Sequence, residues 1–186
     1  LTMLCSSVAS ECFQVQTLSP EAAAYHFLSG YTADLGMTPR GHNSLIDATF
    51  SACFGAPFLP RPAAQYIYLF LKRLTEFNAQ VYLVNKGWQG GNRDSGQRIS
   101  LPVSRQIIAA IQNGEVSRAP KTTLQPMNLD VPISLTGIDP VRLDPRACWS
   151  DTRKYDAAAD QLAQAFAGNI KQFDISDSII NAGPLG

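Results

Sequence analysis

The sequence predicts an α/β protein, because short apolar runs typical of strands alternate with segments that carry helix-start signals. Residues 80 to 85 give the clearest strand pattern, and Leu1 to Cys5 is a second apolar run. Proline marks two helix starts, at Ser19-Pro20 and at Pro102. With 45% hydrophobic and 16% charged residues, the 186-residue chain can bury the core of one domain.

The first third of the chain is expected to hold one helix and one long loop. Ser19 is the predicted N-cap of a helix that should end near Gly30. Residues 31 to 48 contain glycine, proline and asparagine and predict a long loop, a kind of segment that is often functional. Thr49 to Gly55 is compact and apolar, which predicts a short strand or a packed turn.

Three further helices are expected, over residues 63 to 77, from Pro102 to Asn113-Gly114, and over residues 152 to 173. Between the last two, residues 115 to 149 are rich in proline and in short β-type runs. The apolar residues of the first of these helices fall near one face and are expected to pack in the core: Tyr66, Leu69, Phe70, Leu74 and Phe77. For the second helix the expected buried residues are Ile107, Ile108 and Ile111.

Charge and cysteine content exclude several classes of function. The 15 basic and 15 acidic residues cancel and form no basic stripe, so we expect no nucleic-acid partner. No apolar run is long enough for a membrane helix and no signal peptide is visible, so we expect a cytoplasmic protein with no membrane partner. The four cysteines show no C-x-x-C spacing, which favours reduced thiols over a structural zinc site.

The stretch GWQGGNRDSGQRISLPVSR, residues 87 to 105, is the most informative part of the chain. Gly91 and Gly96 have the spacing of a phosphate-binding loop, but Gln97-Arg98 stands where that loop needs Lys followed by Ser or Thr. Gln97 cannot supply the charge, and the planar guanidinium of Arg98 differs from a compact ammonium. A plain surface loop is one alternative.

A loop that clasps a nucleotide base or ribose is the other alternative. Glycines let the backbone approach a planar ring, Arg98 can stack on it, and Ile99 can cover its other edge. Ser104 lies at the start of a predicted helix, where its hydroxyl can reach a polar atom of the ligand.

Several motifs, in the same order and spacing, resemble the ATP-dependent phosphoenolpyruvate carboxykinase family. They span essentially the whole chain: YHFLSGYTA at 25 to 33, TFSACFG at 49 to 55, YLVN at 82 to 85 with Gly87-Trp88, residues 96 to 105, and LDPR at 143 to 146. The resemblance is to roughly the C-terminal third of that family. It implies that residues 1 to 186 are a single partial domain, the C-terminal part of a mixed-sheet mononucleotide-binding domain.

The resemblance implies an activity and a role for the glycine-rich stretch. The family is a lyase of gluconeogenesis that decarboxylates oxaloacetate with ATP, giving phosphoenolpyruvate, ADP and carbon dioxide, with magnesium and manganese. Arg98, Ile99 and Ser104 match positions on the adenine side of its ATP site, with Ser104 in place of a threonine. We therefore expect ATP and ADP as ligands of this chain, bound in the full enzyme together with the N-terminal part.

No catalytic or metal-binding residue is assigned to this chain. The family's phosphate-binding loop, metal ligands and oxaloacetate-binding residues match no position here, so we expect the 186 residues alone to be inactive. His26 is expected to be a packed histidine, and His42 to be exposed to solvent.

Departures from the family pattern leave a second hypothesis open. Residues 6 to 14 differ from the usual sequence, Lys86 replaces a threonine, and Asp34 replaces a lysine. The changes at 6 to 14 and at Asp34 favour a stand-alone, non-catalytic remnant that binds a nucleotide or a partner, whereas the retained Gly-Trp and Arg-Ile-Ser motifs favour the enzyme. The coding DNA upstream of Leu1 separates the two hypotheses, because an in-frame GxxGxGK[ST] motif would indicate the enzyme.

Overall fold

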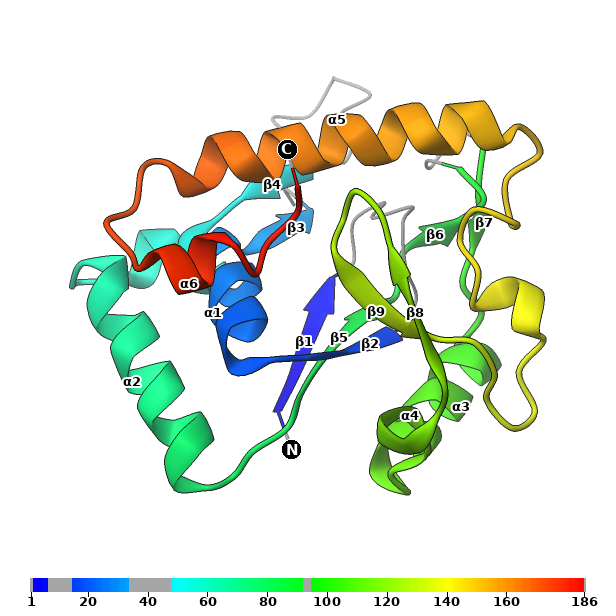
Figure 1. Cartoon of the computed structure of the whole chain (residues 1–186), viewed down its shortest axis with the longest axis horizontal. Helices are drawn as coiled ribbons and strands as arrows, with labels where there is room; N and C mark the ends of the chain where they lie inside the picture. Colours follow the sequence, from blue (N-terminus) through cyan, green and yellow to red (C-terminus); the bar gives the residue numbers. More distant parts are fainter. Residues whose placement is uncertain (1, 7–14, 34–47, 92–94, 186) are drawn as a thin grey trace, which may run out of the picture.

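The computed structural model describes residues 2–6, 15–33, 48–91 and 95–185. Its central feature is a three-stranded sheet in the order β1-β5-β2. The middle strand, β5 (Val81–Asn85), runs parallel to β1 (Thr2–Ser6) and antiparallel to β2 (Val15–Leu18). Figure 1 shows helices on both sides of this sheet. The predicted α/β class with a mixed sheet is confirmed, as are strands near both predicted positions.

Strand β5 separates two hydrophobic clusters because its side chains alternate between the two faces of the sheet. Val81 and Leu83 belong to one cluster, with residues of α1, α5 and α6. Tyr82 and Val84 belong to the other, with residues of α3 and α4. All five residues of β5 are buried, so this strand is the centre of both cores.

Helix α1 (Pro20–Ser29) begins and ends where the sequence predicts. The hydroxyl of Ser19 accepts a hydrogen bond from the backbone N–H of Ala22 (3.1 Å), which satisfies a free donor of the first turn. Gly30 ends the helix in the left-handed region, with φ of 55°. A side chain there would collide with the backbone oxygen of Ser51, so this position requires glycine.

The ends of the predicted long loop are strands. β3 (Tyr31–Ala33) pairs antiparallel with β4 (Ala48–Phe50), and residues 34–47 lie outside the described part of the chain. Two short 3₁₀ turns follow, η1 (Ala52–Phe54) and η2 (Ala56–Phe58). The segment from 49 to 55 is thus both a short strand and a packed turn.

Helix α2 (Ala63–Glu76) forms as predicted, but the expectation that its whole apolar stripe packs in the core is wrong. Leu74 is buried, and Tyr66 and Phe70 are partly buried. Leu69 and Phe77 are 51% and 67% exposed. Ile67, which the stripe omitted, is buried instead. Ala63, Phe70 and Leu71 also pack on this core, so the helix meets it along one stripe that leaves Leu69 and Phe77 outside.

The second half of the chain builds the other layers (Figure 1). After β5 come β6 (Trp88–Gln89) and β7 (Gln97–Arg98), then α3 (Leu101–Gln112), α4 (Glu115–Arg118) and the antiparallel hairpin of β8 (Lys121–Leu124) and β9 (Leu129–Pro132). In α3, Ile107 and Ile111 are buried and Ile108 is partly buried, close to the prediction.

The long C-terminal helix α5 (Thr152–Ile170) follows the short turn η3 (Pro140–Arg142) and precedes α6 (Asp177–Ile180). Its N-cap is Asp151, whose carboxylate accepts a hydrogen bond from the N–H of Arg153 (3.0 Å). Phe173 lies just beyond the helix rather than inside it, but still packs on the core. In the described ranges, no helix has the length and apolar character needed to cross a membrane.

Candidate functional site

The glycine-rich stretch that the sequence singled out is a β-hairpin followed directly by a helix. Strands β6 and β7 pair antiparallel, with Trp88 opposite Arg98 and Gln89 opposite Gln97. Ile99 then closes the hairpin through its N–H, which donates to the carbonyl oxygen of Gly87 (3.0 Å). The next helix, α3, begins two residues later at Leu101.

Asn85, the last residue of β5, fixes the turn into this hairpin. Its side-chain oxygen accepts a hydrogen bond from the N–H of Gly87 (2.8 Å), and its side-chain nitrogen donates to the carbonyl oxygen of Trp88 (3.3 Å). Asparagine commonly bonds to its own backbone two residues on, which turns the chain at the end of a strand. Asn85 is buried, so the hairpin starts from a rigid point in the central sheet.

The hairpin is also attached to a distant segment of the chain. The amide nitrogen of Gln89 donates to the carbonyl oxygen of Arg142 (2.8 Å) and to the sulfur of Cys148 (2.7 Å). The thiol of Cys148 in turn donates to the carbonyl oxygen of Val141 (3.0 Å). Segment 139–148 therefore holds β6 from the side, across more than 50 residues of sequence.

Gly90 allows this close approach. Its φ is +74°, a left-handed conformation that residues with a side chain rarely adopt. A Cβ atom at this position would lie 2.5 Å from the backbone oxygen of Cys148, much closer than van der Waals contact. The glycine predicted to let the backbone approach a ligand thus brings the hairpin against segment 139–148.

Arg98 is exposed and lies over the ring of Trp88. Its guanidinium carbon is 5.3 Å from the centre of that ring, within the range of a cation–π contact. In the described part of the chain, no carboxylate forms an ion pair with Arg98. The Arg98 side chain is thus exposed to solvent, with the Trp88 ring beside its guanidinium.

Ile99 and Ser104 are placed differently from Arg98. Ile99 is only 5% exposed, so its side chain already packs inside the protein and offers little apolar surface to a ligand. Ser104 is partly buried in the first turn of α3, and its hydroxyl lies 3.2 Å from the carbonyl oxygen of Ser100, to which it donates. Because its hydrogen is used there, the oxygen of Ser104 can only accept a further hydrogen bond.

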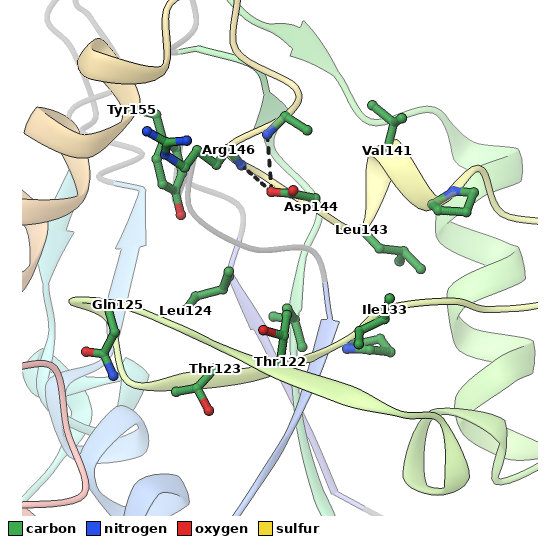
Figure 2. A pocket seen from close by; sticks show the side chains of 14 residues that line it. Thr122, Thr123, Leu124, Gln125, Ile133, Val141, Leu143, Asp144, Arg146 and Tyr155 are labelled. Atoms are coloured by element: carbon green, nitrogen blue, oxygen red, sulfur yellow. Dashed lines mark hydrogen bonds between the residues drawn. The ribbon is translucent and has the colours of Figure 1, made fainter.

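Two cavities lie on either side of segment 139–148, and Val141 and Ala147 line both. A polar cavity of about 450 Å³ lies beside the hairpin and includes Gln89, Gly90 and Gln97. A larger cavity of about 560 Å³ lies between the β8–β9 hairpin and residues 140–147 (Figure 2). Neither of these two cavities is lined by the predicted site residues Arg98, Ile99 and Ser104.

The larger cavity is mainly apolar, and its charged lining residues are Asp144 and Arg146. Figure 2 shows Leu124, Ile133 and Leu143 among its lining side chains. Arg146, which also lines it, makes two hydrogen bonds with the carboxylate of Asp156, at 2.8 and 2.9 Å. Because Asp156 neutralises this cation, the cavity offers no unpaired charge to an anionic ligand from Arg146.

Burial shifts the pKa of several titratable groups in the described residues. His26 is buried, with ring contacts to Tyr25 and Phe166, and burial lowers its pKa to about 4. The prediction of a packed histidine is confirmed, whereas His42 lies outside the described residues. Across the described ranges, no three His, Cys, Asp or Glu side chains group so as to hold a metal ion. Cys53 and Cys148 are free thiols, and burial raises the pKa of Cys53 to about 11.

The fold and the hairpin define an α/β protein whose mixed sheet carries a glycine-rich hairpin after its central strand. The sequence profile of phosphoenolpyruvate carboxykinase matches residues 3–140. This match covers well over half of the chain, which therefore belongs to the phosphoenolpyruvate carboxykinase family.

Individual relatives agree with the family assignment. The chain is 44% identical over 173 residues to phosphoenolpyruvate carboxykinase (ATP) 1 of Moorella thermoacetica, and 40% identical over 173 residues to phosphoenolpyruvate carboxykinase (ATP) of Caldanaerobacter subterraneus subsp. tengcongensis. Each match covers 92% of this chain and 33% of the relative. A Bacillus cereus relative of the same name is 42% identical over 170 residues, covering 91% and 32%. The chain thus spans about a third of the length of the curated relatives it matches.

Proposed function

We propose that this chain forms the adenine side of the ATP site of an ATP-dependent phosphoenolpyruvate carboxykinase. The observation that carries the proposal is the exposed guanidinium of Arg98, which lies on Trp88 in the hairpin that follows the central strand. Family membership and the names of the relatives, which specify ATP, support the same nucleotide. Residues 1 to 186 would then act together as the C-terminal nucleotide-binding portion of the enzyme.

The chemistry of the hairpin suits a base better than a phosphate chain. A guanidinium plane stacks on aromatic rings as well as pairing with anions. Ser104 has only acceptor capacity left, and the exocyclic amino group of adenine is a hydrogen-bond donor. Ile99 supports the site mainly through its backbone bond to Gly87, because its side chain is buried.

The rest of the reaction would be carried out by the part of the family architecture that this chain does not match. The family resemblance implies decarboxylation of oxaloacetate with phosphoryl transfer from ATP, a step of gluconeogenesis. Phosphoryl transfer depends on positioning and on charge stabilisation of the terminal phosphate. The family resemblance implies magnesium and manganese, which would stabilise that charge, and implies that their ligands match no position of this chain. Binding of the adenosine part of ATP would position its terminal phosphate relative to those groups. ADP would dissociate from the same site after the reaction.

The alternative is a non-catalytic module that binds a nucleotide or a partner. A nucleotide-binding module would share the proposed base-binding hairpin with the lead proposal, and would differ in whether catalytic groups are supplied by the same polypeptide. The coding DNA upstream of Leu1 remains the discriminating observation for that question.

Backbone amide NMR of the 186-residue chain, titrated with adenosine, tests the base-binding assignment. We expect shift changes concentrated in residues 87–91 and 95–105, with a dissociation constant of roughly millimolar strength, about 4 kcal/mol of binding free energy. Tripolyphosphate is the matched control and should leave these amides largely unchanged. Adenosine without effect on this hairpin, or a larger effect of tripolyphosphate there, would contradict the proposal.

A further inference from the structure

The pairing of Trp88 with Arg98 is built into the backbone. The two residues lie directly opposite each other in the antiparallel register of β6 and β7, where facing side chains are near neighbours. The guanidinium carbon of Arg98 lies 5.3 Å from the centre of the Trp88 ring. This contact therefore follows from strand register and does not require a ligand to form.

Trp88 itself stands on a fixed base. Its carbonyl oxygen accepts a hydrogen bond from Asn85, which is buried at the end of the central strand. The next residue, Gln89, is bonded to the backbone of Arg142 and to Cys148. Both sides of Trp88 are thus tied to rigid parts of the protein, whereas Arg98 is a long, exposed side chain with several rotatable bonds.

We propose that Trp88 is a positioning residue that holds the guanidinium of Arg98 flat, so that its opposite face can receive a nucleotide base. This inference rests on the proposed function, because it assumes that Arg98 meets the base. A planar cation lying on one aromatic ring has its second face free for another ring. Trp88 would then raise affinity by ordering Arg98 before the ligand arrives, without touching the ligand.

Two other roles for Trp88 make different predictions. If Trp88 stacks on the base directly, its loss weakens binding even when Arg98 is absent. If Trp88 only keeps the hairpin folded, its loss releases the backbone bond between the N–H of Ile99 and the oxygen of Gly87. A double-mutant cycle with a backbone readout separates these roles from positioning.

The experiment measures adenosine affinity by NMR for wild type, Trp88→Leu, Trp88→Phe, Arg98→Ala and the double variant Trp88→Leu/Arg98→Ala. Hydrogen exchange of the Ile99 amide reports the hairpin in each protein. We expect Arg98→Ala to weaken adenosine binding about two- to thirty-fold, the range of a cation–π contact. Trp88→Leu should weaken binding by at least two-fold, Trp88→Phe by less, and the double variant should bind within two-fold of Arg98→Ala alone.

Each other outcome has a defined meaning. If the double variant binds adenosine clearly more weakly than Arg98→Ala, Trp88 contacts the base directly. If Trp88→Leu binds adenosine as wild type does, Trp88 does not position Arg98. Either result overturns this inference and leaves the proposed function standing. If the Ile99 amide exchanges faster in Trp88→Leu, the hairpin has opened and the Trp88→Phe variant is the informative one. Adenosine affinity of Trp88→Phe near that of wild type supports positioning. A loss of affinity in Trp88→Phe as large as in Trp88→Leu, with the Ile99 amide still protected, overturns it. Unchanged adenosine binding in Arg98→Ala overturns the proposed function and this inference with it.

Discussion

At the scale of a single residue, the proposed site assigns the hydroxyl of Ser104 a role in specificity. Its hydrogen is donated to the carbonyl oxygen of Ser100, so its oxygen can accept from an amino group but cannot donate to a carbonyl. Adenosine carries an amino group at position 6 of the purine, and inosine carries a carbonyl there. The site should therefore prefer adenosine, although no charged side chain is involved in the choice.

We predict that Ser104→Ala weakens adenosine binding about two- to twelve-fold, the loss of one hydrogen bond worth about 0.5–1.5 kcal/mol. Inosine binding should change less than two-fold. Ser104→Thr keeps the hydroxyl and, as the matched control, should retain the preference for adenosine. Parallel NMR titrations of both nucleosides measure the effect, and equal losses for the two would show that Ser104 does not read the amino group.

The sequence singled out several residues of this region but did not show how they are held. The exposed position of Arg98 and the helix-start position of Ser104 follow from local patterns. The buried side chain of Ile99 does not, because burial of one apolar residue in a hairpin depends on what packs against it. Gln89 gave no signal at all, since its partners, Arg142 and Cys148, are more than 50 residues away.

At the scale of elements, Gly90 joins the β6–β7 hairpin to segment 139–148. We predict that Gly90→Ala costs about 1–3 kcal/mol of unfolding free energy, because a positive φ is strained for alanine and the new Cβ meets the backbone of Cys148. Adenosine binding should weaken as well, since the hairpin must move to relieve the contact. Chemical denaturation and NMR titration measure the two effects.

Gly168 is the matched control for this substitution. It lies inside helix α5, and a Cβ atom there has nothing within 4 Å. Gly168→Ala should stabilise the protein by about 0.5–1 kcal/mol, because alanine favours a helix, and should leave adenosine binding unchanged. Gly90→Ala behaving like Gly168→Ala would show that the hairpin does not depend on this close approach.

The packing of α1 against α5 should make the protein sensitive to acid through His26. Burial lowers the pKa of His26 from 6.5 to about 4, so the folded state disfavours the protonated ring. Stability is full above about pH 6.5 and falls as the unfolded state takes up its proton, with the loss complete near pH 4. The difference in pKa corresponds to about 3 kcal/mol of unfolding free energy.

Urea unfolding at pH 7, 5.5 and 4.5, comparing wild type with His26→Phe, tests this prediction. Phenylalanine keeps an aromatic ring beside Tyr25 and Phe166 but has no group to protonate. Effects of acid on carboxylates are shared by both proteins, so the difference between their slopes reports His26. If the unfolding free energy of the two proteins depends on pH in the same way, protonation of His26 does not cause the loss of stability in acid.

Helix and strand positions were predictable where local signals decide them. The Ser19 cap, the Gly30 end and the apolar run of β5 each correspond to an element with nearly the predicted bounds. The stripe of α2 was mispredicted because the spacing of apolar residues gives one face of the helix but not how much of that face other elements cover. Leu69 and Phe77 lie outside the part that contacts the core.

At the scale of the whole molecule, the described sheet has three strands and the chain covers about a third of its relatives. We predict that the purified 186-residue chain forms no phosphoenolpyruvate from oxaloacetate and ATP with magnesium and manganese. The reason is that the family resemblance implies phosphate-, metal- and oxaloacetate-binding residues that match no position of this sequence. Product formation is measured by an enzyme-coupled assay, with the Moorella relative as the positive control, and protein-dependent product would contradict the assignment.

The central claim is that residues 87 to 105 meet the base of the nucleotide and not its phosphates. A base contact affects every adenine ligand alike, whereas a phosphate contact affects ligands in proportion to their phosphate charge. Arg61→Ala is the matched control, because it removes an equal charge from an exposed arginine next to α2, which lies away from β6 and β7 in Figure 1.

The most direct measurement is the affinity of wild type, Arg98→Ala and Arg61→Ala for adenosine, AMP, ADP and ATP by NMR titration. We predict that Arg98→Ala weakens all four by a similar factor, about two- to thirty-fold, as expected for the loss of a cation–π stack. Arg61→Ala should change none of them by more than two-fold. A loss in Arg98→Ala that is large for ATP, smaller for ADP and absent for adenosine would place Arg98 on the phosphates and contradict the base-side assignment.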